Sequence, residues 1–221
     1  ERIGPGVTTA DIDRWVHDYT VEHGAIPAPL DYEGFPKSVC TSLNNVVCHG
    51  IPSEHEFLME GDILNVDVST ILDGYYSDAS RMFTIGDISP EAARLVRVTQ
   101  ECVDLGLKAA KPWGHLGDIA HAINSHARKH GYSVVEDIGG HGIGLEFHEE
   151  PFVSYVTPKG SEMVLVPGMM FTIEPMVNEG SPDFFVDEAD DWTVYTIDDG
   201  LSAQIEYMVL VTESGIEVLS K

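Results

Sequence analysis

Four acidic residues lie in segments where a solvated surface carboxylate would be unusual. Asp67, Glu174 and Glu206 stand inside the apolar runs NVDV, FTIEPM and AQIEYMVLV, and Asp78 lies in YYSDASR. Two like charges about 4 Å apart at an effective dielectric constant near 20 repel by roughly 4 kcal/mol. Four such carboxylates in one cleft therefore cannot all stay ionised unaided, and either protons or metal ions must lie among them.

Each acid taken alone fits a second interpretation, a buried carboxylate paired with a base. Few basic residues are available for this role, and the main candidates are Lys37 and Arg81. For the four acids together, the scarcity of Lys and Arg favours a metal site.

An internal repeat relates these acids to one another. At an offset of 107 residues Asp67 falls on Glu174, and beyond an acidic insertion Asp78 matches Glu206. Six further residues recur unchanged at this offset: Pro5, Asp11, Ile12, His23, Gly24 and Gly61 match Pro112, Asp118, Ile119, His130, Gly131 and Gly168. These seven matches at one offset indicate a duplicated half-domain. A pseudo-twofold axis between the halves would bring the acids face to face.

The segment 62–83 predicts a β-hairpin that presents two of the acids together. Its two β-rich runs meet at Asp73-Gly74, a strong signal for a two-residue turn. Such a turn places Asp67 opposite Ser80 and Asp78 opposite Ser69. The two acids then lie on one face as diagonal neighbours, within reach of a shared ion.

Helical patterns alternate with the β-rich runs. We expect a first helix capped by Thr8 or Thr9 and closed by Gly24, a second that opens at Ser89-Pro90, and a third over 116–130. The stretch 178–200 carries eight carboxylates and neither Lys nor Arg. It is typical of a solvated hairpin, with Trp192 as the exception.

Three histidines are candidates for chemistry. His141 stands between Gly140 and Gly142 and would add a nitrogen ligand to the oxygen set. His148 follows seven residues later. His49, in the segment VCHGIP, is a further exposed imidazole on a tight turn, where capping of that turn is the alternative role.

Composition limits the class of protein. The 221-residue chain has 37 acidic and 12 basic side chains, and a net charge of -25 argues against DNA or an anionic membrane as a partner. The three cysteines lack a zinc-binding spacing, which favours a reducing, cytoplasmic compartment. The sequence shows no apolar run of membrane-spanning length and no signal peptide. Because it begins at Glu1 and not at Met, we expect residues upstream of it to be missing.

The ordered set of motifs resembles type I methionine aminopeptidase from about Gly4 to the C-terminus. The segments that carry this resemblance are CHGIP, NVDV, SDASR, GHGIG, FHEEP, FTIEPM, the pair Trp192-Thr193, and SAQIE. The resemblance implies an α+β pita-bread fold, in which two pseudo-twofold half-domains surround a central antiparallel sheet with a dinuclear metal site. We therefore expect one catalytic domain over residues 1–221, with halves of about 1–105 and 106–221.

The resemblance also implies roles for individual residues. Asp67 would chelate one divalent ion (Co, Mn, Fe or Zn), His141 and Glu174 would bind a second, and Asp78 and Glu206 would bridge the two. His49 and His148 would contact the substrate amide, and Glu174 would also shuttle a proton. The methionine pocket would be lined by Tyr32, Phe35, Cys40, Phe147 and Trp192.

The implied activity is hydrolytic removal of the N-terminal methionine from nascent proteins and peptides with a small second residue. The expected partners are these N-termini, with transient ribosome association, and we expect a monomer. One alternative is an Xaa-Pro peptidase on the same fold, of the prolidase or aminopeptidase P type. Another is a metal-free pita-bread binding module, against which the complete set of five ligands argues. The family usually has His, Thr and His where this chain has Glu33, Ala79 and Tyr207.

Overall fold

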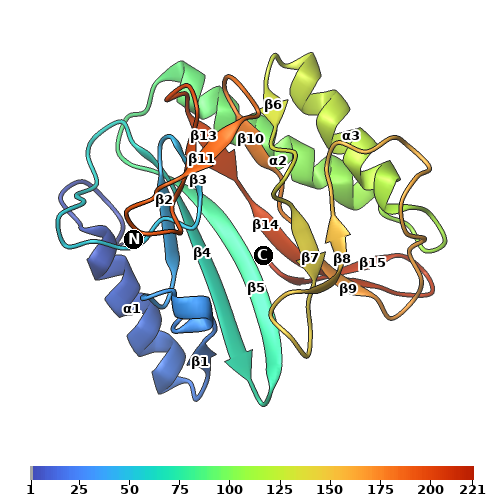
Figure 1. The fold of residues 1–221 in the computed structure, drawn as a ribbon, viewed down its shortest axis with the longest axis horizontal. Helices are drawn as coiled ribbons and strands as arrows, with labels where there is room; N and C mark the ends of the chain where they lie inside the picture. Colours follow the sequence, from blue (N-terminus) through green and yellow to red (C-terminus); the bar gives the residue numbers. More distant parts are fainter. Residues whose placement is uncertain (1) are drawn as a thin grey trace.

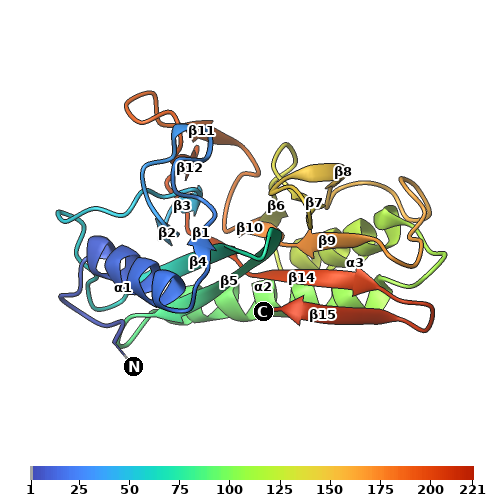
Figure 2. The same ribbon diagram turned by 90° about the horizontal axis from the view of Figure 1, so that it is seen from below.

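The computed structural model describes residues 2–221 and shows a large curled sheet with helices against it (Figures 1 and 2). The structure has helices α1 (Thr9–Glu22), α2 (Pro90–Ala109) and α3 (Leu116–Lys129), and a short 3-10 turn, η1 (Tyr32–Gly34), lies between the first two strands. Apolar residues of α2 and α3, such as Leu95 and Ile123, share the main core with Phe171 and Val209 of the sheet. The short strands β3, β11 and β12 lie on the side of the sheet away from α2 (Figure 2).

Within the described residues, nine strands form the large sheet and six form two smaller sheets. The path of the large sheet is β1-β4-β5-β14-β9-β7-β8, with β2 on β4 and β15 on β14. Its strands are β1 (Ile26–Pro27), β2 (Cys40–Leu43), β4 (Ile63–Leu72), β5 (Tyr75–Thr84), β7 (Gly140–Gly142), β8 (Glu149–Val153), β9 (Met170–Ile173), β14 (Glu206–Val211) and β15 (Ile216–Ser220). The smaller sheets are β13-β10-β6 (Ser202–Gln204, Met176–Asn178, Ser133–Val134) and β11-β12-β3 (Phe184–Val186, Val194–Thr196, Val46–Cys48).

The 107-residue repeat of the sequence recurs in the structure. Helices α1 and α3 begin and end at positions that differ by 107, and so do the first residues of β4 and β9. The isolated bridge between Thr8 and Phe57 recurs as that between His115 and Val164. The two halves thus have equivalent helices and strands. The expected division near residue 105 falls inside α2, and the organisation as one domain stays a prediction.

The predicted hairpin forms with the predicted register. Asp73 and Gly74 have φ angles of 52° and 85°, as a tight turn with two left-handed residues requires. Asp67 pairs with Ser80, and Ser69 pairs with Asp78. On the other edge of β5, Ser80 also pairs with Glu206 of β14. One row across three strands therefore carries an acid at each end.

The helix boundaries agree with their sequence signals. Thr8 and Asp11 form the capping box of α1, and Gly24 follows its end with a φ of 76°. Ser89 caps α2, with Pro90 at its first position. Helix α3 ends at Lys129, one residue before the expected end, because His130 is its C-cap.

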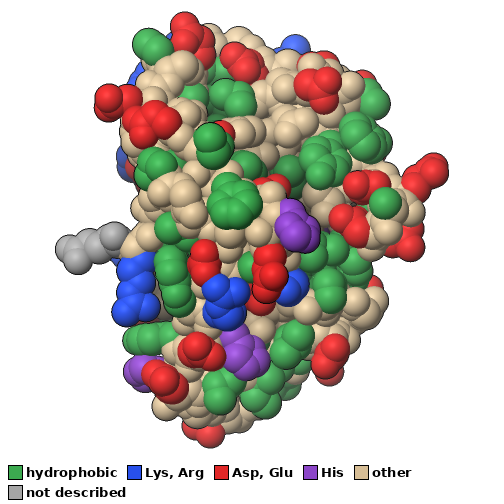
Figure 3. All heavy atoms as spheres, turned by 90° about the vertical axis from the view of Figure 1, so that its left-hand side faces the viewer, with side chains coloured by type: hydrophobic (Ala, Val, Ile, Leu, Met, Phe, Trp, Pro, Cys, Tyr) green, Lys and Arg blue, Asp and Glu red, His purple; other side chains and the backbone are tan. Residues whose placement is uncertain are grey.

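The acidic stretch forms the predicted hairpin, but solvent surrounds only part of it. Strands β11 and β12 pair with each other, and β12 also pairs with β3 through Val194 and Cys48. The connection between β11 and β12 projects from the molecule (Figure 2), and the face shown in Figure 3 carries more acidic than basic side chains. The hairpin is therefore an anchored element beside His49, the residue that follows β3.

Two further expectations concern composition. All three cysteines are free and buried, so none forms a disulfide. Among residues 2–221, no helix has both the length and the apolar character needed to span a membrane.

Close backbone packing requires a glycine at position 142, next to His141. A Cβ atom on Gly142 would lie 2.2 Å from the carbonyl oxygen of Glu150, whereas one on Gly144 would mainly meet the mobile methyl group of Met170 at 2.7 Å. We expect Gly142→Ala to lower the free energy of unfolding by about 1–3 kcal/mol, because backbone atoms cannot yield locally. Gly144→Ala should cost clearly less. Urea denaturation of both variants measures the difference, and equal losses would contradict this account of β7.

Candidate metal and substrate site

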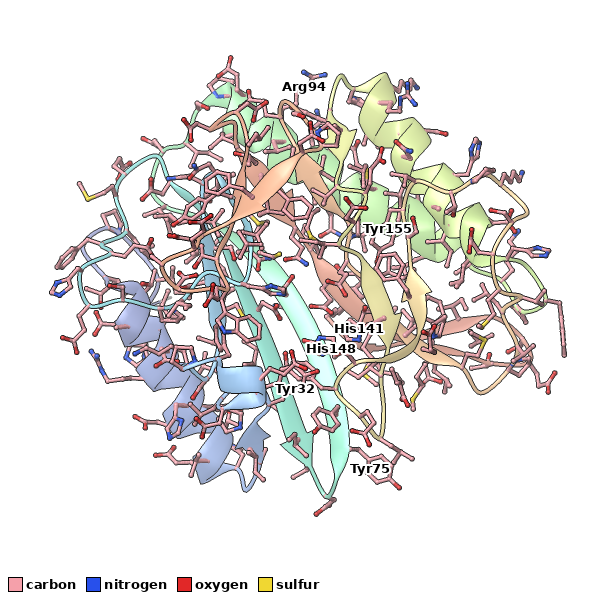
Figure 4. All side chains as sticks on the ribbon, viewed as in Figure 1. Tyr32, Tyr75, Arg94, His141, His148 and Tyr155 are labelled. Carbon is pink, nitrogen blue, oxygen red and sulfur yellow. The ribbon has the colours of Figure 1, made fainter. Side chains whose placement is uncertain are left out.

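One cavity of about 450 Å³ contains every residue that the sequence singles out for function. Its lining includes the metal-ligand candidates Asp67, Asp78, His141, Glu174 and Glu206, the candidate substrate contacts His49 and His148, and the pocket candidates Tyr32, Phe35, Cys40, Phe147 and Trp192. Tyr32, His141 and His148 lie close together near the middle of the molecule in Figure 4. The structure thus brings all twelve together, while their individual roles stay predictions.

Neighbouring strands, β4, β5, β14 and β9, bring the four carboxylates together in the lining of this cavity. The hydroxyl of Ser69 donates to Asp78 Oδ1 at 2.6 Å. Glu174 accepts at both oxygens, from Thr172 Oγ1 at 2.6 Å and from Gln204 Nε2 at 3.0 Å. In contrast, the buried atoms Asp67 Oδ1 and Glu206 Oε1 have no hydrogen-bond partner within the described part of the chain. Buried acceptors without a donor are costly, and a cation between them would satisfy both.

Burial and mutual repulsion shift the protonation of these acids. Burial raises the pKa of Glu174 to about 8, and it raises that of Asp78 as well. The pKa values of Asp67 and Glu206 are raised well above their usual range, first by burial and then by the charges of the other acids. These shifts are the expected response of carboxylates that are clustered and removed from water.

The alternative of acid–base pairs has no support in the structure. Lys37 contacts Asp13 at 3.8 Å, and the guanidinium of Arg81 donates to the carbonyl oxygen of Lys221. Across residues 2–221, neither Lys nor Arg forms an ion pair with any of the four acids. The two bases considered from sequence therefore point elsewhere, and the cluster remains without a basic partner other than His141.

His141 is oriented as a ligand would be. Its Nδ1 lies 3.0 Å from the carbonyl oxygen of Gly142 and, because a carbonyl only accepts, Nδ1 must carry the hydrogen. The free Nε2 lies 3.8 Å from Asp78 Oδ2 and 3.6 Å from Glu174 Oε1. Ligand atoms of Asp78, His141 and Glu206 all lie within 4.8 Å of one another. This donor set fits a divalent cation bound by oxygen and nitrogen.

The other two candidate histidines, His49 and His148, are uncharged at neutral pH. Burial, followed by the neighbouring His141, lowers the pKa of His49 to about 4. Burial and the rings of His141 and His49 also lower the pKa of His148 to about 4. His148 Nδ1 lies 2.9 Å from the hydroxyl of Tyr32, and its ring lies 4.3 Å from that of His141, centre to centre. Both rings can thus act as neutral hydrogen-bonding groups beside the carboxylates.

Aromatic side chains form the apolar wall of the cavity. Tyr32 contacts Phe147 edge-on with ring centres 4.9 Å apart, and Phe35 contacts Trp192 in the same way at 5.2 Å. Trp192 comes from the β11–β12 connection and also lies edge-on to His49 at 6.0 Å. Cys40 is buried and free, and burial raises the pKa of its thiol. It therefore stays a neutral thiol and is a lining residue.

Sequence inspection missed the residues that hold the acids in place. Ser69, Thr172 and Gln204 donate to the carboxylates, and the hydroxyl oxygen of Tyr155 accepts from the backbone amide of Glu174 at 2.7 Å. Polar side chains inside strands look like ordinary strand residues in a sequence. The one available signal was spacing, since Thr172 and Gln204 each stand two residues before a candidate ligand.

Tyr207 differs from the usual family residue without entering the cavity. Its hydroxyl oxygen lies 3.1 Å from Gln100 Nε2 on α2, on the helix side of the sheet. Glu33 does line the cavity, in a left-handed conformation with a φ of 48°. Glu33 and Tyr207, two of the departures from the pattern of the resembled family, thus lie in the cavity lining and behind the sheet, not among the five candidate ligands.

Comparison with known proteins identifies the family. The model of metallopeptidase family M24 matches residues 1–213. The chain belongs to this family. It is similar to methionine aminopeptidase A from Synechocystis sp., with 50% identity over 218 residues that cover 99% of this chain and 86% of the relative. It is also similar to the crystal structure of methionine aminopeptidase from Rickettsia prowazekii, with a TM-score of 0.96, 48% identity, and coverage of 98% and 87%.

These similarities confirm three predictions. The family, the pita-bread fold and the enzyme class, a methionine aminopeptidase of the metallo-exopeptidase type, are as expected. Membership in this family also implies the use of divalent metal. An X-Pro aminopeptidase from Thermotoga maritima is similar in fold, with a TM-score of 0.76, 23% identity, and coverage of all of this chain and 54% of the other.

The raised pKa values predict how the metal-free protein responds to pH. The folded-state pKa of Glu174, about 8, exceeds the ordinary 4.5, so the folded chain holds more protons than the unfolded chain between these values. The stabilising effect of that proton is complete below about pH 4.5 and is lost as the pH rises through 8. We expect the melting temperature of chelator-treated protein to fall across this window. Glu174→Gln should fall less, since its amide does not titrate.

The same scan with saturating Mn²⁺ provides the control. A cation bound among the carboxylates takes over the role of the protons, so the fall should largely disappear. Calorimetry at several pH values measures both effects. Equal slopes for wild type and Glu174→Gln without metal would overturn the assignment of the shifted group.

Proposed function

We propose that the chain removes the N-terminal methionine of peptides and proteins at a site for two divalent ions beside an apolar pocket. The observation that carries this proposal is the composition of one cavity. Its lining combines four carboxylates and His141 with the five apolar or aromatic side chains predicted to form the methionine pocket. A peptide whose first side chain fills that pocket would present its first amide to the carboxylates.

The donor set suggests how the ions would be held. Asp67 would chelate one ion, His141 and Glu174 would bind the other, and Asp78 and Glu206 would bridge them. Oxygen-rich sites with one imidazole suit Mn, Fe, Co or Zn. Bound there, the ions would polarise the substrate carbonyl and lower the pKa of a coordinated water to about 7.

Side chains of the chain itself would move the proton and orient the substrate. Glu174 is held at both oxygens by Thr172 and Gln204, so it is fixed where it would accept a proton and pass it to the leaving amine. If the hydroxyl of Tyr32 donates to His148 Nδ1, then Nε2 carries the hydrogen of His148 and donates to the substrate carbonyl. His49, neutral beside Trp192, would be the second such donor.

The shape and chemistry of the apolar wall favour methionine. Aromatic rings attract a thioether through dispersion and sulfur–aromatic contacts. The thiol of Cys40 adds a second polarisable group at the pocket. A small second residue is the expectation carried over from the family.

The proposal includes partners and compartment. We take the N-termini of nascent polypeptides as substrates, with transient ribosome contact, and a monomeric protein in the cytoplasm. Three buried free thiols support a reducing environment.

Substitution of the two imidazoles tests their role as substrate contacts. We expect His49→Ala and His148→Ala to lower kcat by roughly 10²–10³-fold, because a hydrogen bond made to the reacting amide is lost. Metal content should stay at the wild-type level. Tyr32→Phe should have a smaller effect, since only the group that orients His148 is removed. Loss of bound metal in His148→Ala would instead make this residue a ligand.

A peptide panel tests the pocket. Peptides that begin with Met-Gly or Met-Ala should be cut much faster than Met-Leu or Met-Arg peptides, and Xaa-Pro peptides without Met should be inert. Norleucine should replace methionine at modest cost, because small changes in an apolar pocket are worth only about 1–3 kcal/mol. Trp192→Ala should raise KM for Met substrates while metal content stays constant. Phe185→Ala, an exposed aromatic of the same hairpin, is the matched control.

Product analysis of that panel decides the outcome. Release of whichever residue precedes proline, regardless of its identity, would assign the chain to the Xaa-Pro peptidases. Equal effects of Trp192→Ala and Phe185→Ala on KM would remove Trp192 from the pocket.

A further inference from the structure

A second group of potential metal ligands lies outside the cavity, between the two helices behind the sheet. Glu101 comes from α2, His126 from α3, and His130 from the C-cap of α3. One ligand atom from each lies within 4.8 Å of the other two. None of the three lines the candidate metal and substrate site.

The geometry of this group suits a cation. His126 and His130 are four residues apart, which places both side chains on one helix face, and their ring centres are 4.6 Å apart. His126 Nε2 lies 2.8 Å from Glu101 Oε2. Throughout residues 2–221, neither ring nitrogen of His130 has a hydrogen-bond partner. The cluster therefore has an unused nitrogen next to an imidazole–carboxylate pair.

We propose that Glu101, His126 and His130 form a second divalent metal site that bridges α2 and α3. Two imidazoles and one carboxylate favour Zn, Ni, Cu or Co over Mg or Ca. All three side chains are half-buried, so water would complete the coordination. This ligand set is richer in nitrogen than the four carboxylates and one imidazole of the cavity.

The surrounding charges would weaken the binding of a cation at this site. Arg97 Nη1 donates to Glu101 Oε1 at 2.5 Å, and Arg94 Nη2 donates to the carbonyl oxygen of His130 at 2.7 Å. Both guanidinium groups oppose a cation. The Arg97 side chain is 57% exposed and is free to turn towards solvent, and Glu101 Oε2 already faces His126. A bound ion would replace the hydrogen bond between Glu101 and His126.

The site lies apart from the cavity. Arg94, which marks the position of the His130 carbonyl, lies at the edge of the molecule in Figure 4, away from His141 and His148. An ion at this edge would bind two helices together without contact with substrate. Its expected effect is stabilisation by preferential binding to the folded chain.

Zinc binding by the full chain tests this proposal. Chelator-treated wild type and the double variant His126→Ala/His130→Ala are dialysed against buffered Zn²⁺, and bound metal is measured. We expect the double variant to bind one ion fewer per chain. His121→Ala, an exposed histidine on the same helix, should bind as much as wild type. Glu101→Gln should weaken the extra site by about tenfold or more.

Two further measurements keep the outcome decisive. Peptidase activity with a fixed catalytic metal should be the same in all variants, which separates this site from the proposed function. If the double variant is unfolded without metal, His130→Gln serves in its place, because that ring has no hydrogen bond to lose. Equal zinc stoichiometry in wild type and the folded variant would overturn the proposal and leave the cluster as an imidazole–carboxylate pair alone.

Discussion

The repulsion among three buried carboxylates and the half-buried Asp67 is the constraint on which the site depends. Burial and the neighbouring charges raise the pKa values of Asp67 and Glu206, so protons or a cation must offset this repulsion. Such a cluster must be held by elements that cannot spread apart. The fold meets this need because β4, β5, β14 and β9 are consecutive in one sheet, and backbone hydrogen bonds fix their spacing. Loops would have let the acids separate.

The repeated half-domains explain how such a cluster is assembled. The first half supplies Asp67 and Asp78 from one hairpin, and the second supplies Glu174 and Glu206 at the ends of β9 and β14. The halves meet where β5 pairs with β14, through Ser80 with Glu206 and Ala79 with Tyr207. Because Glu206 belongs to this seam, the position of one half against the other sets the distance between the acids. A change that weakens the pairing of β5 with β14 would therefore also alter the geometry of the site.

Local sequence signals were sufficient where the structure is local. The turn at Asp73-Gly74 fixed the register that places Asp67 beside Asp78, and the fixed offset identified α1 and α3 as equivalent. Signals failed where distant segments pair. Strand β12 joins β3 across about 150 residues, and this contact brings Trp192 to His49. No local pattern encodes that pairing. Hydrogen-bond donors such as Thr172 are hidden for a related reason, since a strand residue shows its partner only once the neighbouring strand is known.

The protonation states of the cavity follow from one physical effect acting on two kinds of group. Desolvation favours the neutral form, so it raises the pKa of Glu174 to about 8 and lowers those of His49 and His148 to about 4. A cation reverses this effect for the acids alone, because it stabilises carboxylates and repels protons from nearby imidazoles. With a cation present, ionised carboxylates and neutral imidazoles would therefore lie side by side. The imidazoles then have no charge with which to pair with the acids, and their N–H groups stay available for a substrate amide.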